Sequence, residues 1–192
     1  MRILMMLRAE RGSRPSRSLG LDQVVEPYYL LHDAGTEVVV VSVLGGHPPF
    51  LGGRRRSTRA TAVLRRFRND HSARDAISDT LKFAQICPED FDGGICIGAL
   101  EEQAGGDDPA GAQNLITALL VAGKPVAVVP SDLLPSSQRP MDGILIIGDQ
   151  ARSPARAARA LLASLELGRE PGPAPIPSDK SADSTKLEPA RV

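Results

Sequence analysis

Short, continuous runs of apolar residues, separated by segments with helical spacing, constrain the fold of this chain most strongly. Strands that are buried on both faces of a parallel sheet have this pattern, because neither face meets water. Such runs predict five strands, at 2–7 (RILMML), 38–43 (VVVVSV), 91–100 (FDGGICIGAL), 125–129 (PVAVV) and 143–148 (GILIIG).

The segments between these runs have apolar residues at helical spacing. In LDQVVEPYYLLHD, the residues Val24, Val25, Tyr28 and Leu31 share one face, and Pro27 predicts that this helix begins or kinks there. Helices are predicted at 21–33, 73–86, 112–122 and 153–167. Ser153 is the expected N-cap of the last one, with Pro154 at its first position.

Because strands alternate with helices, the sequence predicts one α/β domain over residues 1–167 with a mostly parallel sheet flanked by helices. From 168 to 192 the chain is rich in Pro, Ser and charged residues and poor in large apolar ones. We expect this segment to be a disordered tail.

Charge and cysteine usage limit the class of protein. Lys plus Arg equals Asp plus Glu at 23 each, so no global field favours nucleic acid or an anionic membrane. No apolar run reaches membrane-spanning length, and the first residues contain no signal-peptide cleavage pattern, so a cytoplasmic protein is expected. Cys87 and Cys96 do not form a disulfide framework, and Cys96 is expected to be buried in the third strand.

In such sheets, ligands bind outside the carboxyl ends of the strands. His47 is the only one of the three histidines expected near this edge. The spacing of His and Cys residues matches no metal site, and the glycine pairs are not followed by a phosphate-loop pattern, so no metal and no cofactor is predicted. A small-molecule ligand would meet residues at the predicted strand ends: Gly46, His47, Gly98, Ala99, Leu100, Pro130, Ser131 and Asp132.

Four stretches, taken in order, resemble one protein family. They are GLDQVVEPYYLLHDAGTEVVVVSVLGGHPPF, EDFDGGICIGALEE, GKPVAVVPSD and MDGILIIGDQARSPARAARALLASL. They are similar to the ThiJ/PfpI superfamily, which includes DJ-1, and most closely to its glyoxalase-III and protein-deglycase branch. The resemblance implies a flavodoxin-like, class I glutamine-amidotransferase-like fold and a dimer.

The resemblance also implies that the catalytic residues of the family are absent. Aligned on GKPVAVV, the family's nucleophilic Cys falls on Pro130 and its His on Ser131, while its acidic partner falls on Gln23. Proline has neither a nucleophile nor an N–H, and a glutamine cannot transfer a proton. Glu26 is close to Gln23 in sequence but on a different face, and of the family's P-G-G loop only Gly98 is matched.

The connection after Pro130 is shorter than in the family. Only residues 133–142 link it to the last predicted strand, and Asp142 is their only acidic residue. Ser131 and Asp132 are interpreted as caps of a following helix rather than as a substitute nucleophile and acid.

Three hypotheses follow. The first is a non-catalytic binding or partner subunit that forms a homodimer or a heteromer with an active relative. The second is an enzyme with repurposed, cofactor-independent chemistry, such as a hydratase, lyase, glyoxalase, deglycase or biosynthetic tailoring enzyme. Its catalytic candidates are Asp132, Glu101 and Gln23, and Glu26, Glu102 and His47 would help to line the pocket.

The third hypothesis is a nucleic-acid-binding regulator that uses the arginines between Arg54 and Arg68. It is the least favoured, because Phe67 is the only aromatic residue among them and the net charge is zero.

Overall fold

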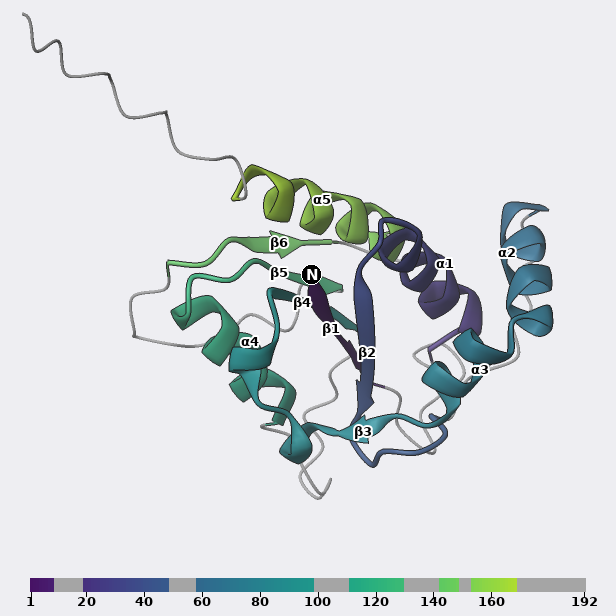
Figure 1. The fold of residues 1–192 in the computed structure, drawn as a ribbon, viewed down its shortest axis with the longest axis horizontal. Helices are drawn as coiled ribbons and strands as arrows, with labels where there is room; N and C mark the ends of the chain where they lie inside the picture. The colour runs from purple at the N-terminus through teal and green to yellow at the C-terminus, as the bar shows by residue number, and fades with distance from the viewer. Residues whose placement is uncertain (9–18, 49–57, 99–110, 130–141, 149–152, 169–192) are drawn as a thin grey trace, which may run out of the picture.

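A six-stranded sheet forms the centre of the molecule in the computed structural model, which describes residues 1–8, 19–48, 58–98, 111–129, 142–148 and 153–168. All paired strands are parallel, and their order is β3-β2-β1-β4-β5-β6 (Figure 1). The strands are β1 (Arg2–Leu7), β2 (Glu37–Ser42), β3 (Leu81–Lys82), β4 (Gly93–Ile97), β5 (Val126–Val129) and β6 (Leu145–Ile147). The predicted parallel α/β architecture is therefore confirmed.

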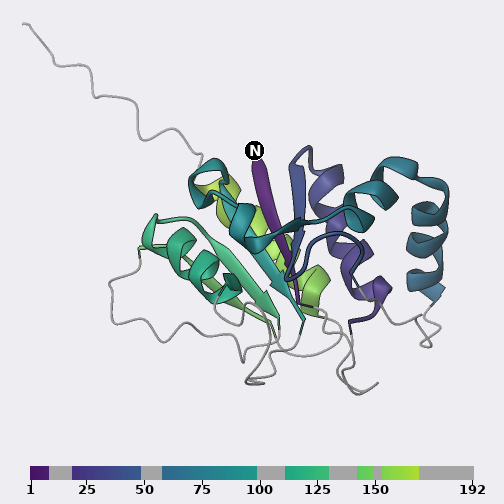
Figure 2. The same ribbon diagram turned by 90° about the horizontal axis from the view of Figure 1, so that it is seen from below.

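Helices cover both faces of the sheet. They are α1 (Leu21–Asp33), α2 (Thr58–Asn69), α3 (His71–Ser78), α4 (Gly111–Val121) and α5 (Ser153–Leu167), with short 3₁₀ turns at η1 (Phe83–Gln85) and η2 (Pro88–Asp90). Helices α1 and α5 lie side by side on one face and α4 lies on the other (Figures 1 and 2). None of the helices in the described ranges is long and apolar enough to cross a membrane.

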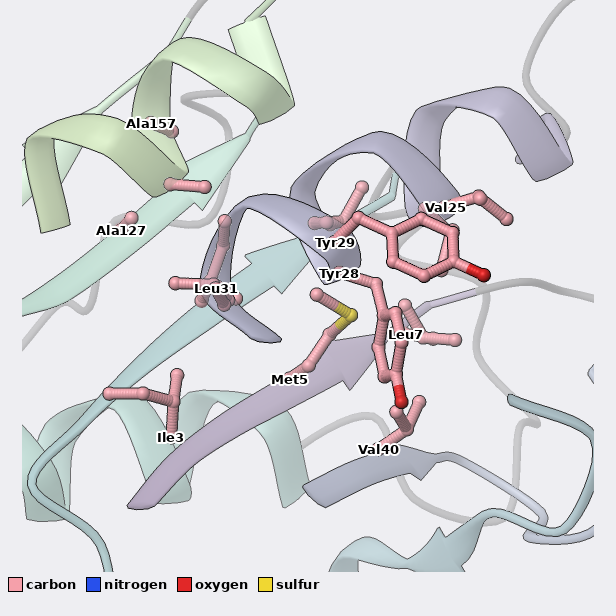
Figure 3. Packing of buried hydrophobic residues seen from close by; sticks show 14 of the residues in the cluster. Ile3, Met5, Leu7, Val25, Tyr28, Tyr29, Leu31, Val40, Ala127 and Ala157 are labelled. Carbon is pink, nitrogen blue, oxygen red and sulfur yellow. The ribbon is translucent and has the colours of Figure 1, made fainter. Parts of the chain in front are cut away.

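The alternation of side chains along β1 divides the core between these two layers. Ile3, Met5 and Leu7 point to the α1 and α5 side, where they pack with Tyr28 and Leu31 of α1 (Figure 3). Leu4 and Met6 point to the α4 side. All five of these β1 residues have 0% exposure, as a central strand of a doubly covered sheet requires.

The first predicted helix has the predicted bounds and continues through Pro27. Pro27 is one of the buried residues of α1. The helix therefore does not begin at the proline.

The region between β2 and β4 differs from the prediction. The prediction of one helix over 73–86 is wrong, because α3 ends at Ser78 and is followed by β3 and η1. Thr80 explains the change: its N–H donates to the Gly46 carbonyl at 3.1 Å, and its hydroxyl lies 2.7 Å from Ser42 Oγ. These bonds draw the chain to the edge of β2, where Leu81 and Lys82 pair as a sixth strand.

Helix α2 was not predicted at all. Val63, Leu64 and Phe67 provide its apolar face and pack against the core on the α1 side. The many arginines around them obscured this pattern in the sequence.

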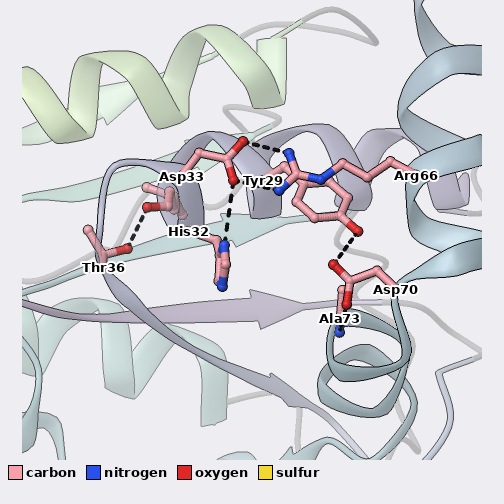
Figure 4. A network of polar contacts seen from close by, with 8 residues as sticks. Tyr29, His32, Asp33, Thr36, Arg66, Asp70 and Ala73 are labelled. Atoms are coloured by element: carbon pink, nitrogen blue, oxygen red, sulfur yellow. Dashed lines mark hydrogen bonds and ion pairs between the residues drawn. The ribbon is translucent and has the colours of Figure 1, made fainter.

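A polar network connects α1 to α2 and α3 (Figure 4). Arg66 of α2 donates to both oxygens of Asp33, at 2.6 and 2.7 Å, and its guanidinium lies 3.8 Å from the centre of the Tyr29 ring. The Tyr29 hydroxyl donates to Asp70 Oδ2 at 3.0 Å. Asp70 is also the N-cap of α3, since its Oδ1 accepts a hydrogen bond from the Ala73 N–H at 3.0 Å.

Replacing Asp70 by alanine should lower the free energy of unfolding by about 1 kcal/mol at pH 7, because the N-cap of α3 is lost. The bond from the Ala73 N–H holds the pKa of Asp70 below its ordinary value of 3.8. A carboxylate with a lowered pKa stabilises the fold above that ordinary value, and this contribution is lost as the pH falls through the folded pKa. Thermal unfolding of Asp70→Ala and of the wild type should therefore differ less at pH 2 than at pH 7.

Asp75→Ala is the matched control, because Asp75 is an exposed carboxylate of the same helix. It should change stability by less than about 0.5 kcal/mol. A stability difference for Asp70→Ala that is the same at both pH values would contradict the assignment.

Candidate functional site

The order of the strands defines one special point at the carboxyl edge of the sheet. From β1 the chain proceeds outward to β2 and β3, and it then returns to place β4 on the other side of β1. Helices α1 and α4, on opposite faces, follow β1 and β4 in the chain. The carboxyl ends of β1 and β4 therefore form a topological switch point, which is where ligands of open α/β sheets bind.

Arg8 and Gly98 lie at this switch point, directly after the paired ends Leu7 and Ile97. The Arg8 N–H donates to the Ile97 carbonyl at 2.9 Å, and the Gly98 N–H donates to the Val129 carbonyl at 3.0 Å. Gly98 has a φ of +120°, and a Cβ at this position would lie 2.2 Å from the Arg8 carbonyl oxygen. Only glycine allows the backbones at the ends of β1 and β4 to approach so closely.

Gln23, a predicted site residue, is used to cap its own helix. Its Oε1 accepts a hydrogen bond from the Gly20 N–H at 3.0 Å, which closes the first turn of α1. Glu26 lies one turn further along α1, is partly buried and is engaged in an interaction within the chain.

Gly46 and His47 lie just beyond β2, two strands away from β4. Gly46 exchanges two backbone hydrogen bonds with Thr80, at 2.7 and 3.1 Å, so this turn is fixed to the start of β3. His47 is exposed and interacts within the chain. The structure thus places His47 towards one side of the sheet rather than at the switch point.

Neither of the two cysteines in the chain has the environment of an activated nucleophile. Cys96 is completely buried in β4, and this burial raises the pKa of its thiol to about 12, although the charge of Arg8 lowers it in part. Cys87 is exposed at the opposite, amino end of β4. Its Sγ donates to Glu89 Oε2 at 3.2 Å, and this bond raises the pKa of Cys87. A reactive thiolate needs a lowered pKa.

No protein-family model and no curated protein sequence matches the chain significantly. Several solved structures, however, have a similar fold. A 24-kDa rapid encystment protein of Francisella tularensis has a TM-score of 0.60 at 13% identity, over 86% of this chain and 99% of that one. Glyoxalase III of Candida albicans has a TM-score of 0.58 at 12% identity, over 85% and 96% of the two chains. A ThiJ/PfpI domain protein of Brachyspira murdochii has a TM-score of 0.55 at 16% identity, over 86% and 96%.

The fold is that of the ThiJ/PfpI proteins. The predicted flavodoxin-like α/β architecture is thereby confirmed. At 12 to 16% identity, the likeness establishes the fold and leaves the activity of this chain to be argued from its own residues.

Seven of the predicted site residues lie outside the described ranges, so their roles stay predictions. They are Ala99, Leu100, Glu101, Glu102, Pro130, Ser131 and Asp132. Asp142 is described and exposed.

The arginine cluster is only partly described, with Arg54 to Arg56 outside the described ranges. Arg65 and Arg68 are exposed on α2. Arg66 forms a salt bridge with Asp33 and a cation–π contact with the ring of Tyr29. One member of the cluster thus stabilises the packing of α2 on α1.

Arg8 is the functional candidate that sequence analysis missed, because its segment resembled an ordinary Arg- and Ser-rich loop. A signal was present: Arg8 is the first charged residue after the RILMML run, at the carboxyl end of the strand. No group of three or more His, Cys, Asp or Glu residues capable of holding a metal ion occurs among the residues that the structure describes.

Proposed function

We propose that this chain is a non-catalytic ThiJ/PfpI-like protein that acts by binding a small molecule or a partner chain. The observation that carries the proposal is the state of its two cysteines. One is buried with a pKa of about 12, and the other lies at the wrong end of the sheet with a raised pKa. A thiol chemistry at the carboxyl edge would need one of them as a thiolate.

Two further observations support the proposal. β5 ends at Val129, and the next residue in the sequence is Pro130, which offers no nucleophile. The Gln23 side chain, at the position of the family's acidic partner, is a neutral amide that already bonds to Gly20. The expected homodimer, or a heteromer with an active relative, belongs to the same proposal, and light scattering of the purified chain with and without such a relative would measure it.

Methylglyoxal is the substrate with which to test the proposal, because glyoxalase III of Candida albicans shares the fold. The purified full chain should convert methylglyoxal no faster than buffer, whereas the Candida enzyme serves as the positive control. D-lactate formation, measured over a range of protein concentrations, gives the readout.

Asp132→Ala and Cys96→Ala make the result specific. Turnover by the wild type that is lost in Asp132→Ala and retained in Cys96→Ala would establish the repurposed enzyme instead. Turnover that is lost in Cys96→Ala would overturn the assignment of that thiol as a structural residue. Circular dichroism of each variant shows whether its fold is intact.

A further inference from the structure

Strand β6 is the last strand on its side of the sheet, and its only strand partner among the described residues is β5. Ile144, directly before it, and Ile147, its last residue, are 55% and 51% exposed. The run from Gly143 to Gly148 contains no charged residue and no proline. Edge strands usually carry such residues, because these prevent pairing with another strand. The outer side of β6 is therefore open to a further strand.

The opposite edge of the sheet is formed by β3 and differs from β6 in this respect. β3 has only two residues, and one of them is the exposed Lys82. A very short strand and a lysine are two of the means by which proteins protect a sheet edge. The sheet thus has one protected edge and one edge that can pair.

The hydrogen bonds to β5 show which main-chain groups of β6 face outward. The Ile144 carbonyl accepts a bond from β5 at 2.8 Å, and the Gly148 N–H donates one to β5 at 2.9 Å. Along a strand, the main-chain groups of every second residue point to the same neighbour, so Ile146 faces β5 as well. The N–H and carbonyl groups of Leu145 and Ile147 therefore point away from β5, to the free edge.

Two copies of this edge complement each other. If two β6 strands pair in an antiparallel manner about a two-fold axis through Ile146, then Leu145 of one copy lies opposite Ile147 of the other. Both residues direct their N–H and carbonyl groups outward, so each such pair exchanges two hydrogen bonds. The two-fold axis generates this pair twice, and together the two pairs use every outward group of both strands.

The same register covers apolar surface. Leu145 packs against the core on the α4 side, and side chains two residues apart share a face, so Ile147 points to that side too. A two-fold axis perpendicular to the sheet leaves this face on the same side in both copies. The half-exposed Ile147 would then pack against Leu145 of the second copy, and no charge between 143 and 148 opposes the contact.

The end of the chain is a poor alternative occupant of this edge. Prolines stand at 171, 173, 175 and 177, and a proline has no N–H to donate to a neighbouring strand. In the part from 178 to 192, Leu187 and Val192 are the only large apolar residues, and six residues are charged. A second copy of β6, by contrast, brings an uncharged apolar strand with matching hydrogen bonds.

We propose that two copies of this chain associate through their β6 strands, antiparallel about a two-fold axis through Ile146, to form one continuous sheet. This inference rests on the homodimer included in the proposed function, to which it gives an interface and a register. Three strand residues from each copy make a small contact, so we expect a reversible dimer that dissociates on dilution.

Sedimentation velocity of the purified full chain over a series of concentrations tests the proposal. Ile147→Lys places a charge on the edge and should raise the dissociation constant of the dimer by about tenfold or more. Leu44→Lys is the matched control, because Leu44 is also 51% exposed but lies in the turn after β2. It should leave the dissociation constant unchanged, and circular dichroism shows whether both variants are folded.

Ile147→Pro tests the backbone bonds separately from the side chain. It removes an N–H that β5 does not use, so each dimer loses two hydrogen bonds and its dissociation constant should rise by about 30-fold. Hydrogen exchange of the wild type gives the same information should this variant not fold. The amide of Ile146 should be protected at all concentrations, whereas those of Leu145 and Ile147 should be protected only in concentrated protein.

A monomer at every concentration would overturn the inference, as would a dimer that Ile147→Lys leaves unchanged. Protection of the Leu145 and Ile147 amides in dilute, monomeric protein would also overturn it, because another segment of the same chain would then cover the edge. These failures are distinct from a failure of the proposed function. Methylglyoxal turnover would refute the non-catalytic role and leave the β6 pairing intact, whereas a dimer through another surface would refute only the β6 interface.

Discussion

Replacing Gly98 by alanine should destabilise the protein by about 4 kcal/mol, enough to remove much of the stability of an ordinary domain. Two costs combine at this position. A φ of +120° is strained for any residue with a Cβ, which costs about 1–3 kcal/mol. The new Cβ would also lie 2.2 Å from the Arg8 carbonyl oxygen, so β1 and β4 must separate at their carboxyl ends. Urea unfolding of the variant and the wild type measures the difference.

Gly123→Ala is the matched control, because Gly123 has a φ of +74° but no heavy atom within 4 Å of an added Cβ. It should lower the free energy of unfolding by only about 1 kcal/mol, because a positive φ strains alanine even where its Cβ meets no other atom. Equal losses in the two variants would show that the approach of Arg8 to Gly98 contributes nothing.

Replacing Leu119 by alanine should cost about 3 kcal/mol, because the side chain is fully buried between α4 and the sheet. The cost has a transfer component and a cavity component, and the cavity component is present only if the surroundings do not collapse into the space. Thermal unfolding followed by circular dichroism measures it. Leu167→Ala, at a position that is 73% exposed, should change stability by less than about 0.5 kcal/mol.

The space that Leu119 fills can be identified by a double-mutant cycle. A Cβ on Gly94 would lie 2.9 Å from Leu119 Cδ1, so Gly94→Ala alone should be destabilising. Combined with Leu119→Ala, the added methyl group enters the cavity instead, so the double mutant should lose less stability than the sum of the two single-mutant losses. Strict additivity would contradict the described contact between β4 and α4.

The sequence was sufficient to predict the elements that lie in the doubly covered part of the sheet. β1, β4 and β5 are buried along their whole length, apart from Arg2 at the start of β1, so their apolar runs are continuous and easily recognised. The bounds of α1 and α5 were also correct.

The sequence was insufficient where tertiary contacts determine the structure. β3 has only two residues, both exposed, and exists because Thr80 bonds to Gly46 and Ser42. These partners are more than 30 residues away in the chain, so no local pattern indicates them. α2 was missed because its few apolar residues are separated by arginines, one of which is bound to Asp33 of another helix.

The candidate site follows the same rule. Its place at the carboxyl edge followed from the predicted parallel sheet, and Gly98 was identified in advance. The switch point itself depends on the strand order, which places β4 beside β1. Without that order, Arg8 could not be distinguished from the other arginines of the first loop.

The place of β1 in the sheet also has a consequence for folding. Its contacts with β2 join residues about 35 positions apart, whereas its contacts with β4 join residues about 90 positions apart. Closing the longer loop costs about 0.8 kcal/mol more free energy, because more chain entropy is lost. Pairing of β1 with β2 is therefore favoured over pairing with β4. During synthesis, β1 leaves the ribosome long before β4 exists. The strand with the most deeply buried side chains thus begins with one unpaired edge, and until β4 arrives this edge is a template for aggregation with other chains.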